Sequence, residues 1–382
     1  MATVATQRPA ALPRPSFKPI IQDAVVEKKS SGSEFEPSKH LGFKQPEQIW
    51  SMEELGYSKD RGVSPIAVSQ PFQLFTEEAV HEMRREIFKP EVLENCKYSS
   101  NIAACQLRGY APKYAPFTYD AWNHPETLAV ISKIAGVDLV PVMDLEIAHV
   151  NFSVKSEKET KEELAIINKQ KRFYADDEGI AGCPWEDDKP VVGWHTDSYP
   201  FVCVLMLSDC TNMVGGETAL RTGRGDVMKV RGPTMGCAAI LQGRYITHQA
   251  LRALGAQERI TAVTSFRPRS PFARDDSVLT TVRPISNLST LYSEFAEYRL
   301  AMMEERVRAQ LKEVREKSRT GKKFATKDFK RFLTEQIAFF QHMQNEMVPD
   351  EEVKIGYIDE IDYPDCVVGS DEEPSPKRTR VD

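Results

Sequence analysis

The sequence has few cysteines and no pair arranged as C-x-x-C. Its seven cysteines are an odd number in 382 residues, and most of them stand inside apolar runs. A disulfide framework needs an even set, and a structural zinc cluster usually shows paired spacing. We therefore expect reduced, buried thiols in an intracellular protein.

Long hydrophobic runs and an excess of positive charge are also missing. No apolar stretch approaches the roughly 20 residues that cross a bilayer, and the first residues contain no hydrophobic signal segment. The formal net charge is -6, which gives no general attraction to phosphate backbones. We expect a soluble cytoplasmic protein that binds neither membrane nor nucleic acid. A nuclear location is the alternative, because the C-terminal tail carries a short basic cluster, Lys377, Arg378 and Arg380.

The chain shows no internal repeat, and its composition changes along its length. Residues 1–65 are polar and rich in proline, which predicts a partly flexible arm. A single domain is predicted over 66–347, with an acidic and then basic, disordered tail over 348–382. Within the domain we expect a core at 140–275, C-terminal helices at 286–347, and a charged insertion at 155–189 that acts as a lid.

The sequence pattern predicts that the core consists of short strands and that helices precede it. Thr76 is a good N-cap for a helix, and a second helix is predicted from about Pro125 to Ile134, ending at Gly136. Beyond Leu139, short β-type runs are separated by glycines, which is typical of an antiparallel sandwich or barrel. The predicted class is α+β.

The residues after about 286 return to a helical period. One apolar stripe is Leu288, Leu291, Phe295, Tyr298 and Met302, and a second is Phe329, Phe332, Leu333, Ile337 and Phe340. This pattern predicts two helices that pack back on the sheet. A separate coiled coil or dimer arm is the alternative, because the first stripe continues to about Val314.

Five polar residues in the β-rich region follow a spacing that suits metal chemistry. His195 and Asp197 form an H-x-D pair in G-W-H-T-D, His248 ends a later strand, and Arg259 and Thr261 share one parity on a strand beyond it. Two imidazoles and a carboxylate on one face of a metal leave three positions open, as a non-haem Fe(II) centre requires. Arg259 offers a rigid fork for a carboxylate, and Thr261 can add a hydrogen bond.

This combination resembles the 2-oxoglutarate- and Fe(II)-dependent dioxygenase superfamily over roughly residues 140–270. The resemblance implies a double-stranded β-helix core of the jelly-roll or cupin-like type, buttressed by N- and C-terminal helices. It implies that His195, Asp197 and His248 bind iron, that Arg259 and Thr261 bind 2-oxoglutarate, and that O2 is consumed. The sequence around these motifs is also similar to that of small-molecule oxygenases of filamentous fungi.

The resemblance implies oxidation of an unactivated C–H bond of a small organic molecule by hydroxylation, desaturation or cyclisation, within secondary metabolism. One alternative is a free amino acid substrate, as in aziridine formation on a branched-chain amino acid. Another is a catalytically silent nuclear binding scaffold. We expect a monomer or homodimer. The residues predicted to line the substrate pocket are His149, Asn151, Tyr174, Trp194, Tyr199 and Arg267.

Overall fold

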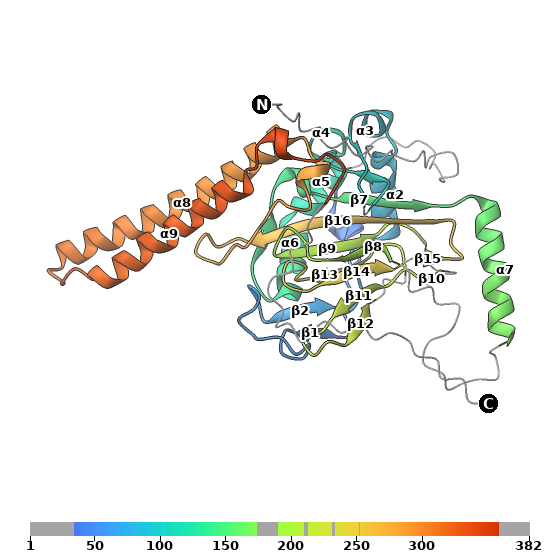
Figure 1. The fold of residues 1–382 in the computed structure, drawn as a ribbon, viewed down its shortest axis with the longest axis horizontal. Helices are drawn as coiled ribbons and strands as arrows, with labels where there is room; N and C mark the ends of the chain where they lie inside the picture. Colours follow the sequence, from blue (N-terminus) through green and yellow to red (C-terminus); the bar gives the residue numbers. More distant parts are fainter. Residues whose placement is uncertain are drawn as a thin grey trace, which may run out of the picture.

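A computed structural model describes residues 34–101, 103–173, 190–209, 213–230, 234–251 and 253–358. It combines helices with antiparallel strands, which confirms the predicted mixture of helix and antiparallel sheet (Figure 1). Within these residues, no helix combines the length and apolar character that crossing a membrane requires. The four cysteines whose state the structure gives are buried free thiols: Cys96, Cys105, Cys203 and Cys237.

The larger sheet of the described chain has ten strands, and its longest member is β16. The order along its main path is β1 (Ile49–Ser51), β2 (Ile66–Ser69), β13 (Cys237–Leu241), β9 (Phe201–Met206), β16 (Glu258–Pro268), β7 (His149–Val154), β5 (Gln106–Leu107) and β4 (Lys97–Tyr98). Two short strands join it from the side, β3 (Phe72–Gln73) on β13 and β6 (Leu139–Pro141) on β16.

A second sheet faces the first. Its order is β12 (Val227–Val230), β11 (Thr218–Arg221), β14 (His248–Leu251) and β8 (Pro190–His195). A two-stranded ribbon completes the described strands, β10 (Val214–Gly215) with β15 (Ala253–Leu254). Side chains from β16 and β9 of the large sheet and from β14 and β8 of the small one line a common cavity, so the space between the sheets holds the candidate site.

The two faces of β16 show why this sequence builds a two-layered core. Ile260, Ala262 and Phe266 point to one side and belong to the main hydrophobic cluster. The alternate residues Arg259 and Thr261 point to the other side and line the cavity. Because side chains alternate along a strand, one segment supplies both the apolar core and a polar site.

N-terminal helices cover the outer face of the large sheet. They are α1 (Pro37–His40), α2 (Glu77–Ile87), α3 (Pro90–Asn95), α4 (Ala111–Tyr114), α5 (Pro116–Asn123) and α6 (Pro125–Ala135). Two sequence predictions are confirmed here. The Thr76 hydroxyl accepts a hydrogen bond from the N–H of Ala79, and Gly136 ends α6 in the left-handed conformation with φ 68°.

Residues on both sides of the predicted domain boundaries belong to the packed structure. Met52 and Leu55, inside the predicted N-terminal arm, are buried against β2 and β13. Residues 348–358, assigned by prediction to the tail, include the 3-10 turn Asp350–Glu352 and reach the cavity through Ile358. The basic cluster at 377–380 lies outside the described residues.

The insertion predicted to be a lid begins with α7 (Glu157–Phe173). Figure 1 shows this helix at the edge of the molecule, on the side opposite the C-terminal helices. Lys155 fixes its start, because its Nζ donates to Glu163 and to the carbonyl of Ala253. None of residues 157–168, the part of α7 whose side chains are described, lines the cavity, and residues 174–189 lie outside the described residues.

The C-terminal helices α8 (Leu288–Arg319) and α9 (Thr326–Glu346) form an antiparallel hairpin that projects from the sheets (Figure 1). At its base, Leu291, Phe295 and Met302 are buried with Phe339. The prediction that both helices pack back on the sheet is therefore correct only for the base. It is wrong for the distal half, where the residues of both helices are mostly exposed and the hairpin lies away from the sheets (Figure 1).

Candidate metal centre and cavity

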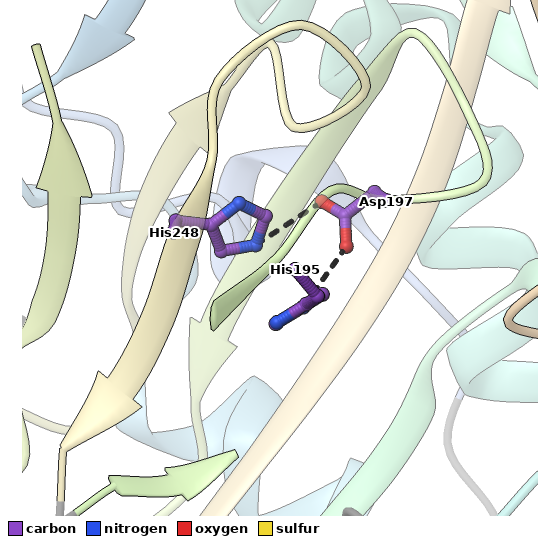
Figure 2. Close-up of side chains that lie close together, drawn as sticks. All are labelled: His195, Asp197 and His248. Atoms are coloured by element: carbon purple, nitrogen blue, oxygen red, sulfur yellow. Dashed lines mark ion pairs between the residues drawn. The ribbon is translucent and has the colours of Figure 1, made fainter. Parts of the chain in front are cut away.

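Three side chains converge where β8 and β14 pair. His195 ends β8 and lies directly across the antiparallel pair from His248, the first residue of β14, with ring centroids 4.4 Å apart. Asp197 follows two residues after His195, and its backbone N–H donates to the carbonyl of Gly243 at 3.0 Å. Figure 2 shows the Asp197 carboxylate facing both rings, with Nε2–Oδ distances of 3.6 Å to His195 and 3.5 Å to His248.

The imidazole rings are held in the tautomer that a metal needs. His195 Nδ1 lies 2.8 Å from the carbonyl oxygen of Gly193, and His248 Nδ1 lies 2.9 Å from that of Ile246. A carbonyl oxygen only accepts, so each Nδ1 carries the proton and donates it. In the neutral form of each ring, the Nε2 lone pair is then directed toward Asp197. Such a donated bond from the second ring nitrogen is the usual support of a metal-bound histidine.

One oxygen of the Asp197 carboxylate, Oδ2, is buried and accepts no hydrogen bond from the described residues, although His248 Nε2 lies 3.5 Å away. The close approach of Gly243 creates this environment, because a Cβ at position 243 would collide with Oδ2 and Cγ of Asp197. Glycine is therefore required there, and a buried carboxylate oxygen with no donor is suited to a cation.

The charges of the three groups favour their joint role. Burial alone would raise the pKa of Asp197, but the charge of His248, and then that of His195, outweigh it and hold that pKa below its ordinary value. Burial lowers the pKa of His248, yet the Asp197 charge outweighs burial and raises it. Candidate ligand atoms of all three residues lie within 4.8 Å of one another, and no other such group occurs in the described part of the chain. The donor set and its spacing fit a divalent metal such as Fe(II).

The three groups open into a cavity of about 200 Å³ between the sheets. Valines and leucine form much of its wall: Val202, Val204, Leu241 and Val263. Arg259 and Thr261 enter from β16, and one guanidinium nitrogen of Arg259 donates to the Gly216 carbonyl at 3.2 Å. The neighbouring Glu258 forms its ion pair with Arg84 at 2.8 Å, on the other face of the strand. Apolar walls with a few polar groups are typical of small-molecule sites.

Comparisons with known proteins give structural likenesses alone. No protein-family model and no curated protein matches the chain. Solved structures similar to it include the epimerase SnoN from nogalamycin biosynthesis, described as non-heme and alpha-ketoglutarate-dependent, with 12% identity, 57% of this chain and 81% of that chain covered, and a TM-score of 0.37.

Two other solved structures are similar in the same way. The alpha-ketoglutarate-dependent carbocyclase SnoK matches 58% of this chain and 88% of its own, with 9% identity and a TM-score of 0.34. An oxidoreductase of the 2OG-Fe(II) oxygenase family from Burkholderia pseudomallei matches 46% and 75%, with 12% identity and a TM-score of 0.30. At these identities and TM-scores the structural likeness is only partial.

Three residues predicted for the substrate pocket do line the cavity: His149, Asn151 and Tyr199. His149 follows Ala148, whose φ of 54° is strained for a residue with a side chain. Burial, and then the charge of Arg108, lower the pKa of His149 to about 3, so the ring is neutral. Its buried Nε2 has no partner among the described residues and is free to meet a bound molecule.

The remaining predicted pocket residues lie elsewhere. Trp194 has the opposite strand parity to His195, and its ring stacks on the guanidinium of Arg221 at 4.7 Å. Arg267 has the parity of Arg259, but it lies at the far end of β16, where its guanidinium covers the Tyr298 ring at 4.8 Å. Neither is among the residues that line the cavity, which corrects both assignments. Tyr174 lies outside the described residues.

The sequence did not predict the buried ion pair between Arg108 and Glu146 at the cavity wall. Glu146 accepts hydrogen bonds from both terminal nitrogens of Arg108 and, at 2.5 Å, from the hydroxyl of Tyr199. Arg108 also donates to Ser286 at 2.9 Å. Because the charge of Arg108 is paired with Glu146, Arg108 does not serve as an anchor for a substrate carboxylate. No spacing rule links positions 108, 146 and 199, so the sequence carries no signal for this contact.

Proposed function

We propose that this chain is a 2-oxoglutarate- and Fe(II)-dependent oxygenase with a double-stranded β-helix core, which oxidises a C–H bond of a small organic molecule. The observation that carries the proposal is the convergence of His195, Asp197 and His248 at the inner end of a cavity that also contains Arg259. His195 ends β8 and Asp197 follows it by two residues, while His248 and Arg259 come from β14 and β16, and all four side chains line the same cavity.

Each group of the site has a role in this proposal. His195, Asp197 and His248 would hold Fe(II), and the iron would supply O2 activation coupled to oxidative decarboxylation of 2-oxoglutarate to succinate and CO2. Arg259 would bind the distal carboxylate of 2-oxoglutarate through its planar fork, and Thr261 would add a hydroxyl. The valines around them exclude water from a reactive site.

The cavity favours a small molecule without a carboxylate over a free amino acid. Among the described residues that line it, Arg259 alone is an arginine or lysine, and 2-oxoglutarate would occupy it. Arg108 is committed to Glu146. A free amino acid would bring a second carboxylate with no basic partner. We therefore place a neutral or cationic organic substrate first, in secondary metabolism, and the amino acid second.

Succinate formation tests the proposal. The full chain is incubated aerobically with Fe(II), ascorbate and 2-oxoglutarate, with and without a metabolite extract, and succinate is measured by mass spectrometry. We expect turnover that disappears in His195→Ala and persists in the matched variant His81→Ala, which changes a histidine on α2 outside the cavity. If the wild type makes no more succinate than His195→Ala in any mixture, the enzyme reading fails and the binding scaffold is favoured.

A further inference from the structure

The projecting hairpin, called the arm below, consists of α8 and α9 with their connection. Its two helices meet along one seam. The guanidinium groups of Arg299 and Arg306 lie over the Phe339 ring at 3.9 and 4.4 Å, and Arg306 also donates to Gln336 at 3.4 Å. The seam residues recur every three or four positions on each helix, which is the spacing of paired helices. The contact between α8 and α9 is thereby accounted for.

A second apolar stripe follows the seam by one residue on each helix. It contains Leu300, Val307 and Leu311 of α8 and Leu333, Ile337 and Phe340 of α9. These six side chains are between 44% and 69% exposed. Single exposed leucines are ordinary on any surface. Six exposed apolar side chains, each one position after a residue of the seam, form a pattern that packing within one chain does not explain.

Helical geometry places both halves of this stripe on one side of the arm. A step of one residue turns the side chain by about 100° around the helix axis. In an antiparallel pair, that step rotates the two helices in opposite senses when both are viewed from the same end. The residues after the seam therefore point the same way on α8 and α9. The arm presents one continuous apolar face, and an exposed contiguous patch of this kind marks an interaction site.

Charge is divided along the arm. The tip, residues 312–331, carries nine Lys and Arg against three Asp and Glu. The base, residues 288–308 with 335–346, carries six Asp and Glu against three Lys and Arg, and three further acids, Asp350, Glu351 and Glu352, follow shortly after α9. Two arms that lay side by side in the same direction would bring like charges together. Two arms in opposite directions would bring each basic tip against an acidic base.

We propose that the apolar face of the arm pairs with the same face of a second copy of this chain, with the two arms antiparallel. The result is a two-fold, four-helix bundle in which the same patch is used by both partners. The six apolar side chains of each arm form its centre, and complementary charges at tip and base set its direction. The two cavities lie at opposite ends of such a dimer, since each arm projects from its own sheets (Figure 1).

Sedimentation velocity over a range of micromolar concentrations tests the pairing. We expect a reversible dimer whose dissociation constant rises at least 10-fold in Ile337→Glu and in Leu311→Glu. The matched control is Val227→Glu, which places the same charge at an exposed position on β12, away from the arm. Circular dichroism and succinate formation verify that each variant is folded. A wild type that is monomeric at every concentration overturns the proposal, as does equal dissociation by Val227→Glu.

Cross-linking tests the direction. Unlabelled and 15N-labelled chains are mixed, so that links between two copies can be recognised by mass. A zero-length carbodiimide should join tip lysines such as Lys322 and Lys323 to base carboxylates such as Asp350 and Glu351 of the other copy. Intermolecular links between two tips, obtained with a lysine-reactive reagent, would show a parallel pairing and overturn the antiparallel assignment.

Discussion

The cavity and the arm reverse the usual distribution of polar and apolar groups in opposite ways. Between the sheets, Asp197 Oδ2 and His149 Nε2 are buried and have no hydrogen-bond partner among the described residues. On the arm, apolar side chains such as Ile337 and Phe340 are exposed. Both arrangements cost folding stability when nothing else is bound. In each region, binding of a further component would therefore offset a cost that the folded chain carries alone.

The two regions also use charge differently. At the cavity wall the Arg108–Glu146 pair is buried on both sides, and neither group can turn to water. On the arm, Arg308 and Glu304 pair while both remain largely exposed. Buried pairs are costly to break, whereas exposed ones contribute little. Removing one partner of each pair should therefore give a large difference between the two regions in the free energy of unfolding.

The largest expected effect is that of Glu146→Gln. It leaves the buried charge of Arg108 without a carboxylate and should lower the free energy of unfolding by about 3–5 kcal/mol. The matched change Glu304→Gln on the arm should lower it by less than about 0.5 kcal/mol. Urea unfolding of the three proteins measures both values. Similar losses in the two variants would show that burial does not separate the regions.

The next effect concerns the metal. A methyl group at position 243 pushes against the Asp197 carboxylate, so Gly243→Ala should weaken Mn(II) binding by about 10–100-fold. Gly193→Ala is the matched control, because a Cβ there meets nothing within 4 Å. Titration calorimetry under anaerobic conditions reads out affinity without turnover. Unchanged Mn(II) affinity in Gly243→Ala, in a folded protein, would remove Asp197 from the site.

The co-substrate gives a third contrast. Arg259→Met should raise the KM for 2-oxoglutarate by about 10–100-fold, since a hydrogen-bonded charge is lost. Arg269→Met removes an arginine at the end of the same strand, where the side chain pairs with exposed Asp138, and should leave KM unchanged. Initial rates of succinate formation at varied 2-oxoglutarate decide between them. Equal KM values would mean that another group holds the co-substrate.

The smallest effect is a dependence on pH. The pKa of His149 is about 3 in the folded protein and near 6.5 when unfolded, so the unfolded chain takes up the proton first on acidification. The contribution of this pKa difference to the free energy of unfolding is complete above pH 6.5 and is lost as the pH falls toward 3. Between pH 7.5 and 5 the loss should be about 1–2 kcal/mol, and smaller in His149→Asn. Denaturant unfolding at both pH values measures it; an equal loss in the variant would contradict this.

The sequence was most informative where chemistry depends on spacing within one or two strands. His195 and Asp197 share a strand end, and His248 begins the strand beside it, so the convergence of the three follows from local order. Strand parity also placed Arg259 and Thr261 together. The same parity would have excluded Trp194, whose side chain must point away from that of His195.

Other features depend on long-range packing that no local pattern specifies. Arg108 and Glu146 come from separate elements, and only the folded sheet brings them together. Arg267 has the correct parity but lies beyond the cavity, because strand length and not parity decides where a pocket ends. On α9, the predicted stripe combined two neighbouring faces. Phe332 belongs with the seam, and Leu333 and Ile337 belong to the exposed side.

The contact between Asn101 and the segment after α9 has a consequence for synthesis of the protein. Asn101 accepts from the N–H of Ile358 at 3.1 Å, donates to its carbonyl at 3.2 Å, and so holds Ile358 at the cavity wall. The candidate metal ligands His195, Asp197 and His248 all stand more than a hundred residues earlier in the chain. A growing or truncated chain can therefore assemble the three ligands while one wall of the cavity is still missing. Only a chain translated past position 358 contains every described residue of the cavity wall.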